Sequence, residues 1–153
     1  MKIILNDRAL LKISGADSEV FLQNQLSNDI KKLDESSAQL NAFCQHQGKI
    51  ISLFWVMRYE GNFLLSFPED LLEKIQSRLK MFIIISDVII QDVTKDFCQF
   101  GLINETHEGA FTIKGDLSVV IEKFNHKGEI NTNSIDIWRK ACIDSELPEI
   151  FSI

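Results

Sequence analysis

Two helical patterns alternate with β-forming runs in the first 93 residues, and this alternation constrains the fold more than any other feature. In residues 69–82 apolar side chains recur every three or four positions, which places them on one stripe of a helix. The members of this stripe are Leu71, Leu72, Ile75, Leu79 and Phe82. Glu69 and Asp70 stand at the positive end of the helix macrodipole, and Arg78 and Lys80 at its negative end, so the charges also favour a helix.

A similar pattern covers residues 17–33, where Asp17 or Ser18 is expected to cap the helix. Its apolar members, again spaced by three and four, are Phe21, Leu22, Leu26, Ile30 and Leu33. Its opposite face is polar. We therefore predict an amphipathic helix that continues to Leu33.

The runs between these helices are rich in residues that suit strands. The expected strands are 9–14, 39–45, 49–59, 63–67 and 83–93, with turns at Gly48 and at residues 60–62. The order of strand, helix, three strands, helix and strand predicts a ferredoxin-like α+β sandwich, in which both helices cover one face of a single sheet.

A second, less regular unit is expected in residues 94–153. Residues 98–103 and 117–124 have strand composition, and residues 135–144 form a last helix before Pro148. The expected domains are therefore 1–93, the ferredoxin-like half, and 94–153, a reduced second unit.

Charge and motifs exclude several functions. The 153 residues carry a net charge of −6 with scattered basic residues, which argues against a broad nucleic-acid surface. The nucleotide, hydrolase and zinc-protease motifs are absent, and His46, His107 and His126 stand in loop contexts without a neighbouring nucleophile. The three cysteines are far apart and are interpreted as small core residues in a reducing compartment. No apolar run is long enough to span a membrane, so we expect a cytoplasmic protein. No Cys/His pair has zinc spacing, so we expect no metal.

Polar side chains gather at the end of the first predicted helix. Asn24 and Asn28 would share a face of that helix, with Asp29 turned about 100° away. One interpretation is an ordinary solvated helix surface. The other is a binding wall, because amides and a carboxylate offer donors and acceptors that suit the edge of a heteroaromatic ring such as a pterin.

The two tryptophans are the other candidates. Trp55 stands among apolar residues of a predicted strand and is interpreted as core. Trp138 stands in the last predicted helix, where an indole is either core or a flat platform on which a ring ligand can stack.

Three motifs in order resemble the amino-terminal part of the YgfZ family, which are folate-binding relatives of the glycine-cleavage aminomethyltransferase. They are DRALLKISGADSEVFLQNQLSNDI, FCQHQGKIISLF and IDIWRKACIDSELPEI. The resemblance covers residues 5–92 and resumes over residues 135–150.

The resemblance implies a tetrahydrofolate-binding protein that supports iron–sulfur enzymes and tRNA modification and is not a conventional catalyst. Trp138 matches a folate-contacting tryptophan of the family, and Arg8 replaces a second one found in a close relative. Asn28 and Asp29 are expected near the polar edge of the pterin. The alternatives are a folate-dependent aminomethyltransferase, with Asp29 as its acid, and a structural remnant that docks a partner without binding folate.

The chain also departs from the family. Residues 97–133 are shorter than the matching family segment, and the signature KGCYxGQE and the carboxy-terminal barrel do not occur before Ile153. We therefore expect a fragment or a natural truncation whose open site binds folate weakly as a monomer, and self-association is one expected way to complete it.

Overall fold

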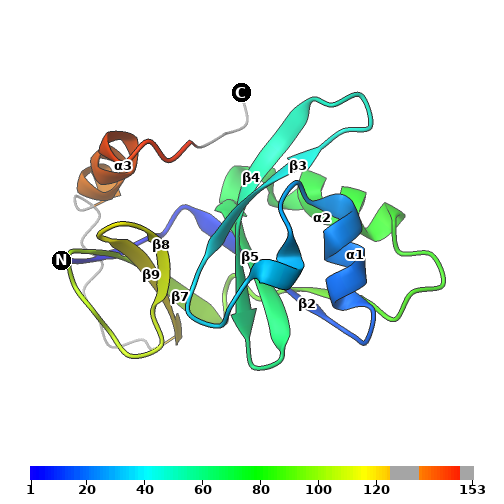
Figure 1. The fold of residues 1–153 in the computed structure, drawn as a ribbon, viewed down its shortest axis with the longest axis horizontal. Helices are drawn as coiled ribbons and strands as arrows, with labels where there is room; N and C mark the ends of the chain where they lie inside the picture. The colour runs from blue at the N-terminus through cyan, green and yellow to red at the C-terminus, as the bar shows by residue number, and fades with distance from the viewer. Residues whose placement is uncertain (125–134, 149–153) are drawn as a thin grey trace.

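The computed structural model describes residues 1–124 and 135–148, which form two antiparallel sheets and three α-helices (Figure 1). The strands are β1 Lys2–Ile4, β2 Arg8–Ser14, β3 Gln39–Cys44, β4 Ile50–Tyr59, β5 Asn62–Pro68, β6 Ile89–Asp92, β7 Phe97–Ile103, β8 Phe111–Lys114 and β9 Leu117–Lys123. The helices are α1 Ser18–Gln25, α2 Leu72–Met81 and α3 Ile135–Asp144, with 3-10 turns η1 Ile30–Lys32 and η2 Glu69–Leu71.

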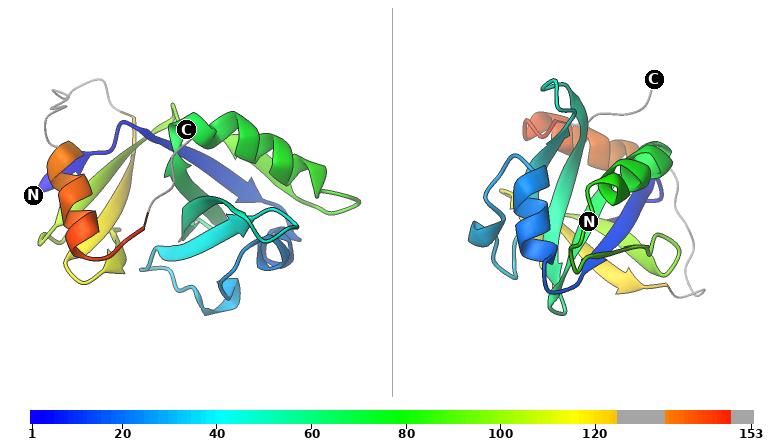
Figure 2. Two further views of the ribbon diagram at one scale, coloured as in Figure 1. Left: turned by 90° about the horizontal axis from the view of Figure 1, so that it is seen from above. Right: turned by 90° about the vertical axis from the view of Figure 1, so that its right-hand side faces the viewer.

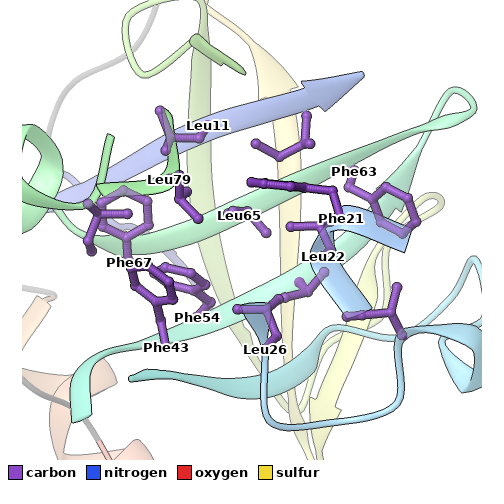
Figure 3. Packing of buried hydrophobic residues seen from close by; sticks show 14 of the residues in the cluster. Leu11, Phe21, Leu22, Leu26, Phe43, Phe54, Phe63, Leu65, Phe67 and Leu79 are labelled. Atoms are coloured by element: carbon purple, nitrogen blue, oxygen red, sulfur yellow. The ribbon is translucent and has the colours of Figure 1, made fainter. Parts of the chain in front are cut away.

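The larger sheet has the strand order β3-β4-β5-β2-β6. Without the edge strand β3, this is the order of a ferredoxin-like sandwich, so the predicted fold class is confirmed. Helices α1 and α2 cover one face of the sheet, and their buried side chains meet those of β2, β4 and β5 in the first core (Figure 3). The labelled members of this core are Leu11, Phe21, Leu22, Leu26, Phe43, Phe54, Phe63, Leu65, Phe67 and Leu79.

The predicted helix over residues 17–33 is wrong beyond Gln25. Leu26 is extended, with φ −110° and ψ 156°, and forms a β-bridge with Phe43. Ile30 begins a separate 3-10 turn. Leu26, Ile30 and Leu33 are nevertheless all buried in the first core. The apolar spacing therefore predicted correctly that these residues are buried, but wrongly that the helix continues through them.

The predicted strand over residues 83–93 is also wrong in its first half, because β6 begins only at Ile89. The preceding loop is tied to the start of α1. The backbone N–H of Asp87 donates to Asp17 Oδ2 at 2.8 Å, so this carboxylate holds the loop and does not cap the helix. Gly15 is required there, because it has φ +108° and a Cβ would lie 2.1 Å from the carbonyl oxygen of Asp87.

The second sheet has the order β1-β7-β9-β8. The sequence predicted β7 and β9 but neither β1 nor β8, which are only three and four residues long. Because β1 pairs with β7, residues 2–4 belong to this sheet. The domain division at residue 93 stays a prediction.

A second core fills the space between the two sheets, and α3 closes one side of it (Figure 2). Its buried members are Ile3, Leu5, Leu10, Ala38, Trp55, Met57, Leu64, Val93, Phe111, Leu117, Val119, Ile121 and Trp138. Helix α3 has the predicted bounds and contacts β1 and β7. Cys44 is exposed at the end of β3, so the interpretation of this cysteine as core is wrong. Within residues 1–124 and 135–148, every helix is too short or too polar to cross a membrane.

Candidate functional site

Trp138 is the buried residue of α3 and packs in the second core, with the partly buried Ile135, Ala141 and Cys142 packed against the same core. Its indole is 4% exposed and lies directly against Gly101 of β7, where an added Cβ would come within 2.4 Å of the ring. Its edge meets Trp55 in a T-shaped contact with ring centroids 6.0 Å apart. The next residue, Arg139, forms an ion pair of 2.6 Å with Asp7. A single glycine therefore decides where the indole can lie.

Arg8 lies beside these tryptophans, at the start of β2. Its side chain is buried, and its guanidinium carbon stands 3.7 Å from the centroid of the Trp55 ring. Its Nε donates to Ser66 Oγ at 2.8 Å, and its Nη2 donates to the carbonyl oxygen of Ser66 at 2.9 Å. The planar fork of an arginine suits this combination of stacking and paired hydrogen bonds.

A glutamine from the other sheet completes this polar group. Ser66 Oγ donates to Gln99 Oε1, while Gln99 Nε2 donates to the carbonyl oxygens of Arg8 and Ala9 at 3.3 and 3.2 Å. Neither Ser66 nor Gln99 was predicted from the sequence. The available signal was a polar residue inside each of two apolar strand runs, FLLSF and FCQFGLI.

Two hollows meet at Arg8. The first, of about 160 Å³, is bounded by Arg8, Trp55 and Trp138, with the Asp7–Arg139 ion pair at its rim. The second, of about 450 Å³, has Arg8 and Gln99 in its wall. Ligand sites usually measure roughly 300–1,000 Å³, so the first hollow has room for one ring and the second for a larger group. Aromatic walls with the guanidiniums of Arg8 and Arg139 suit a flat ring that carries hydrogen-bond acceptors.

Of the four predicted site residues, Arg8 and Trp138 lie together around the first hollow. Asn28 and Asp29 do not line this hollow. Asn28 and Asp29 stand in the turn between α1 and β3, beside the first core. Because α1 ends at Gln25, Asn24 and Asn28 do not share a helix face.

The polar side chains of this turn bond to its own backbone. Asn28 Oδ1 accepts the N–H of Asp29 at 2.9 Å, and Asp29 Oδ1 accepts the N–H of Lys31 at 3.1 Å. Gln23 Oε1 accepts the N–H of Ile30 at 2.8 Å, and Asn41 Oδ1 accepts the N–H of Asn28 at 2.8 Å. These bonds satisfy the backbone N–H groups of the turn, which lies beyond the end of α1 and so has no helical partners for them.

His46 and His107 line neither of the two hollows. His46 is exposed, and His107 Nε2 lies 2.7 Å from Glu105 Oε1 at the end of β7. Glu105 also pairs with the Met1 ammonium, and hydrogen bonds from that ammonium and from His107 lower the pKa of this carboxyl to about 2. His126 lies outside the described residues. Over residues 1–124 and 135–148, no three His, Cys, Asp or Glu side chains are grouped as metal ligands.

Comparisons with known proteins agree with the predicted resemblance, although no family model matches the chain. A tRNA-modifying protein YgfZ of Klebsiella pneumoniae is 36% identical over 86 residues, which are 56% of this chain and 26% of that protein. An uncharacterized protein of Haemophilus influenzae is 26% identical over 154 residues, which cover 97% of this chain and 54% of its relative. The chain thus spans about a quarter to a half of the length of these relatives.

The fold has a counterpart among solved structures. The glycine cleavage system aminomethyltransferase T of Bartonella henselae superposes with a TM-score of 0.58 at 12% identity, over 65% of this chain and 27% of that one. At this identity the match shows the fold alone. In sequence the chain is YgfZ-like, and in structure it has the aminomethyltransferase fold.

Proposed function

We propose that this chain binds tetrahydrofolate, or a derivative of it, as a YgfZ-like protein that supports tRNA modification and iron–sulfur enzymes. The observation that carries the proposal is the cluster of Arg8, Trp55 and Trp138 around a hollow, in a chain with YgfZ-like sequence and the aminomethyltransferase fold. We assign the chain a binding role and not a catalytic one, because among the described residues that line the hollow the acid Asp7 is ion-paired with Arg139, and the other ionisable groups are two guanidiniums and the Cys142 thiol.

The residues present fit a pterin in a specific way. The guanidinium of Arg8 covers one face of Trp55, and Gly101 lies against Trp138, so we propose that a ring would stack on the part of the Trp138 indole that borders the hollow. A hollow of about 160 Å³ holds the ring but not a whole folate, so the remainder of the ligand would extend away from α3 or past Arg8 into the larger hollow. An open site of this kind buries little of its ligand, and we expect weak binding.

A fluorescence titration with tetrahydrofolate tests the proposal, with calorimetry as a second measurement. Saturable quenching is expected in the unchanged chain, and Trp138→Met should weaken binding roughly 2- to 12-fold, the usual worth of one aromatic stacking contact. Phe82→Met is the control, because it removes an aromatic side chain at the end of α2, opposite α3 (Figure 1). The absence of saturation, or equal affinities for the unchanged chain and Trp138→Met, would reject the site.

The contact of Asn28 and Asp29 with the ligand is a separate proposal, because these residues do not line the hollow and could contact only a part of the ligand that extends out of it. Asp29→Asn tests this contact cleanly, because an amide oxygen can still accept the N–H of Lys31 while the negative charge is lost. A weaker affinity with unchanged thermal stability is expected if the carboxylate contacts the ligand. An unchanged affinity would remove Asp29 from the site and leave the tryptophan cluster in place.

A further inference from the structure

The segment of residues 81–89, which we call the α2–β6 surface, exposes more large apolar side chains than any comparable segment among the described residues. Met81 is 69% exposed, Phe82 44%, Ile84 71%, Ile85 103% and Ile89 55%. The surface lies at the end of the molecule opposite α3 and its hollow (Figures 1 and 2). Exposed apolar groups concentrated in this way mark interaction sites in soluble proteins.

The loop holds these side chains outward by well-defined contacts. Ile83 packs against the first core, and Val88 is buried in it. Asp87 Oδ2 accepts the N–H of Ala16 at 3.1 Å. Ile85, between these fixed points, has φ +56°, a conformation that a β-branched residue adopts only at a cost. The contacts at both sides of the loop therefore sustain a strained and fully exposed isoleucine.

The backbone beside this loop is also available for pairing. Strand β6 is the outermost strand of the larger sheet, and within the described part of the chain no strand pairs with its outer edge. Ile89, the first residue of β6, belongs to the α2–β6 surface. An outer edge of this kind offers main-chain hydrogen bonds to a partner strand.

The charges around the surface favour a second copy of this chain as the occupant. Lys80 and Asp87, both exposed, stand on either side of the segment that holds the apolar run 81–85. A two-fold interface must complement itself, and an axis near Ile84 brings Lys80 of one copy toward Asp87 of the other. An anionic lipid surface is a poorer match, because it would repel Asp87, whereas a second copy offers Lys80 to this carboxylate. We propose that the α2–β6 surface joins two copies of this chain about a two-fold axis.

Sedimentation velocity over a range of protein concentrations tests the proposal. We expect a reversible monomer–dimer equilibrium in which Ile84→Asp raises the dissociation constant at least about tenfold, since it puts a charge into the centre of the interface. Ile137→Asp is the matched control. This isoleucine is 47% exposed on α3, at the opposite end of the molecule, and its replacement should leave the equilibrium unchanged.

A second variant tests the orientation of the two copies. Lys80→Glu should weaken the dimer, because it would place two acidic side chains together, and 0.5 M salt should reduce the difference from the unchanged chain. Circular dichroism checks that each variant is folded, which is expected because both side chains are exposed.

Three outcomes would overturn the proposal. The first is a monomer at every concentration, and the second is a dimer that Ile84→Asp does not weaken. The third is a monomer that co-sediments with phosphatidylserine vesicles through Ile84, which would assign the surface to lipid.

Discussion

The two cores of this protein are built differently. The first core, under α1 and α2, is a continuous cluster of apolar side chains that includes the ring series Phe43, Phe54 and Phe67. Beside the second core, between the sheets, Arg8, Ser66 and Gln99 form a buried polar group, and a hollow remains under α3. Complete packing gives stability, whereas a site needs space and polar groups that are held in place. We therefore propose that the first core mainly supplies stability and that the second core holds the binding site.

The largest expected effect comes from opening the first core. Phe54 is fully buried, and its ring lies 5.6 Å from that of Phe43 and 5.2 Å from that of Phe67. Phe54→Ala should lower the free energy of unfolding by about 3–5 kcal/mol, because it removes a buried ring and leaves a cavity. Urea unfolding measures this loss. If the two cores have separate roles, the folded fraction of this variant keeps its affinity for tetrahydrofolate, and a loss of both together would contradict the comparison.

A smaller effect is expected where α3 meets the second core. Gly101→Ala should destabilise the protein by about 1–3 kcal/mol, because the new methyl group collides with the Trp138 ring. The displaced indole should shift tryptophan fluorescence to longer wavelength and weaken tetrahydrofolate binding. This variant therefore tests the second core as Phe54→Ala tests the first. Gly101→Ala should weaken tetrahydrofolate binding, whereas Phe54→Ala should leave the affinity of the folded protein unchanged. Unchanged fluorescence would show that Trp138 does not depend on Gly101 for its position.

The smallest effect is expected at the end of β7. Because the Met1 ammonium and His107 lower the pKa of Glu105 from its ordinary 4.5 to about 2, the charged carboxylate stabilises the folded state above pH 4.5. This contribution should fade as the pH falls from about 4.5 to about 2 and be absent below that range. The melting temperatures of the unchanged chain and Glu105→Gln, measured across these pH values, should converge toward pH 2. A difference that stays constant across the range would contradict this assignment.

Prediction from the sequence succeeded where a residue's neighbours along the chain decide its structure. The stripe of Leu71, Ile75 and Leu79 specified α2, and residues 135–144 specified α3. Prediction failed where pairing with a strand that is distant in sequence competes with the local structure. Leu26 leaves the helix because Phe43 offers a β-bridge, and the three residues of β1 become a strand only because β7 lies beside them.

The candidate site shows the same division. Trp138 and Arg8 were identified from the motifs, but their contact with Trp55 and Gln99 depends on strands that are far apart in sequence. Asn28 and Asp29 were chosen because their side chains can form hydrogen bonds with a ligand. In the structure their side-chain oxygens accept hydrogen bonds from the backbone of their own turn.

The sequence by itself determined the order of the longer helices and strands, the apolar face of each helix and the YgfZ-like character of the chain. These properties are local, since they depend on periodicity and on motifs read in order. Only the tertiary structure decided which polar residues surround a hollow and which close a turn. That choice depends on the pairing of remote strands, because burial and hydrogen-bond partners are set by neighbours in space and not by neighbours along the chain.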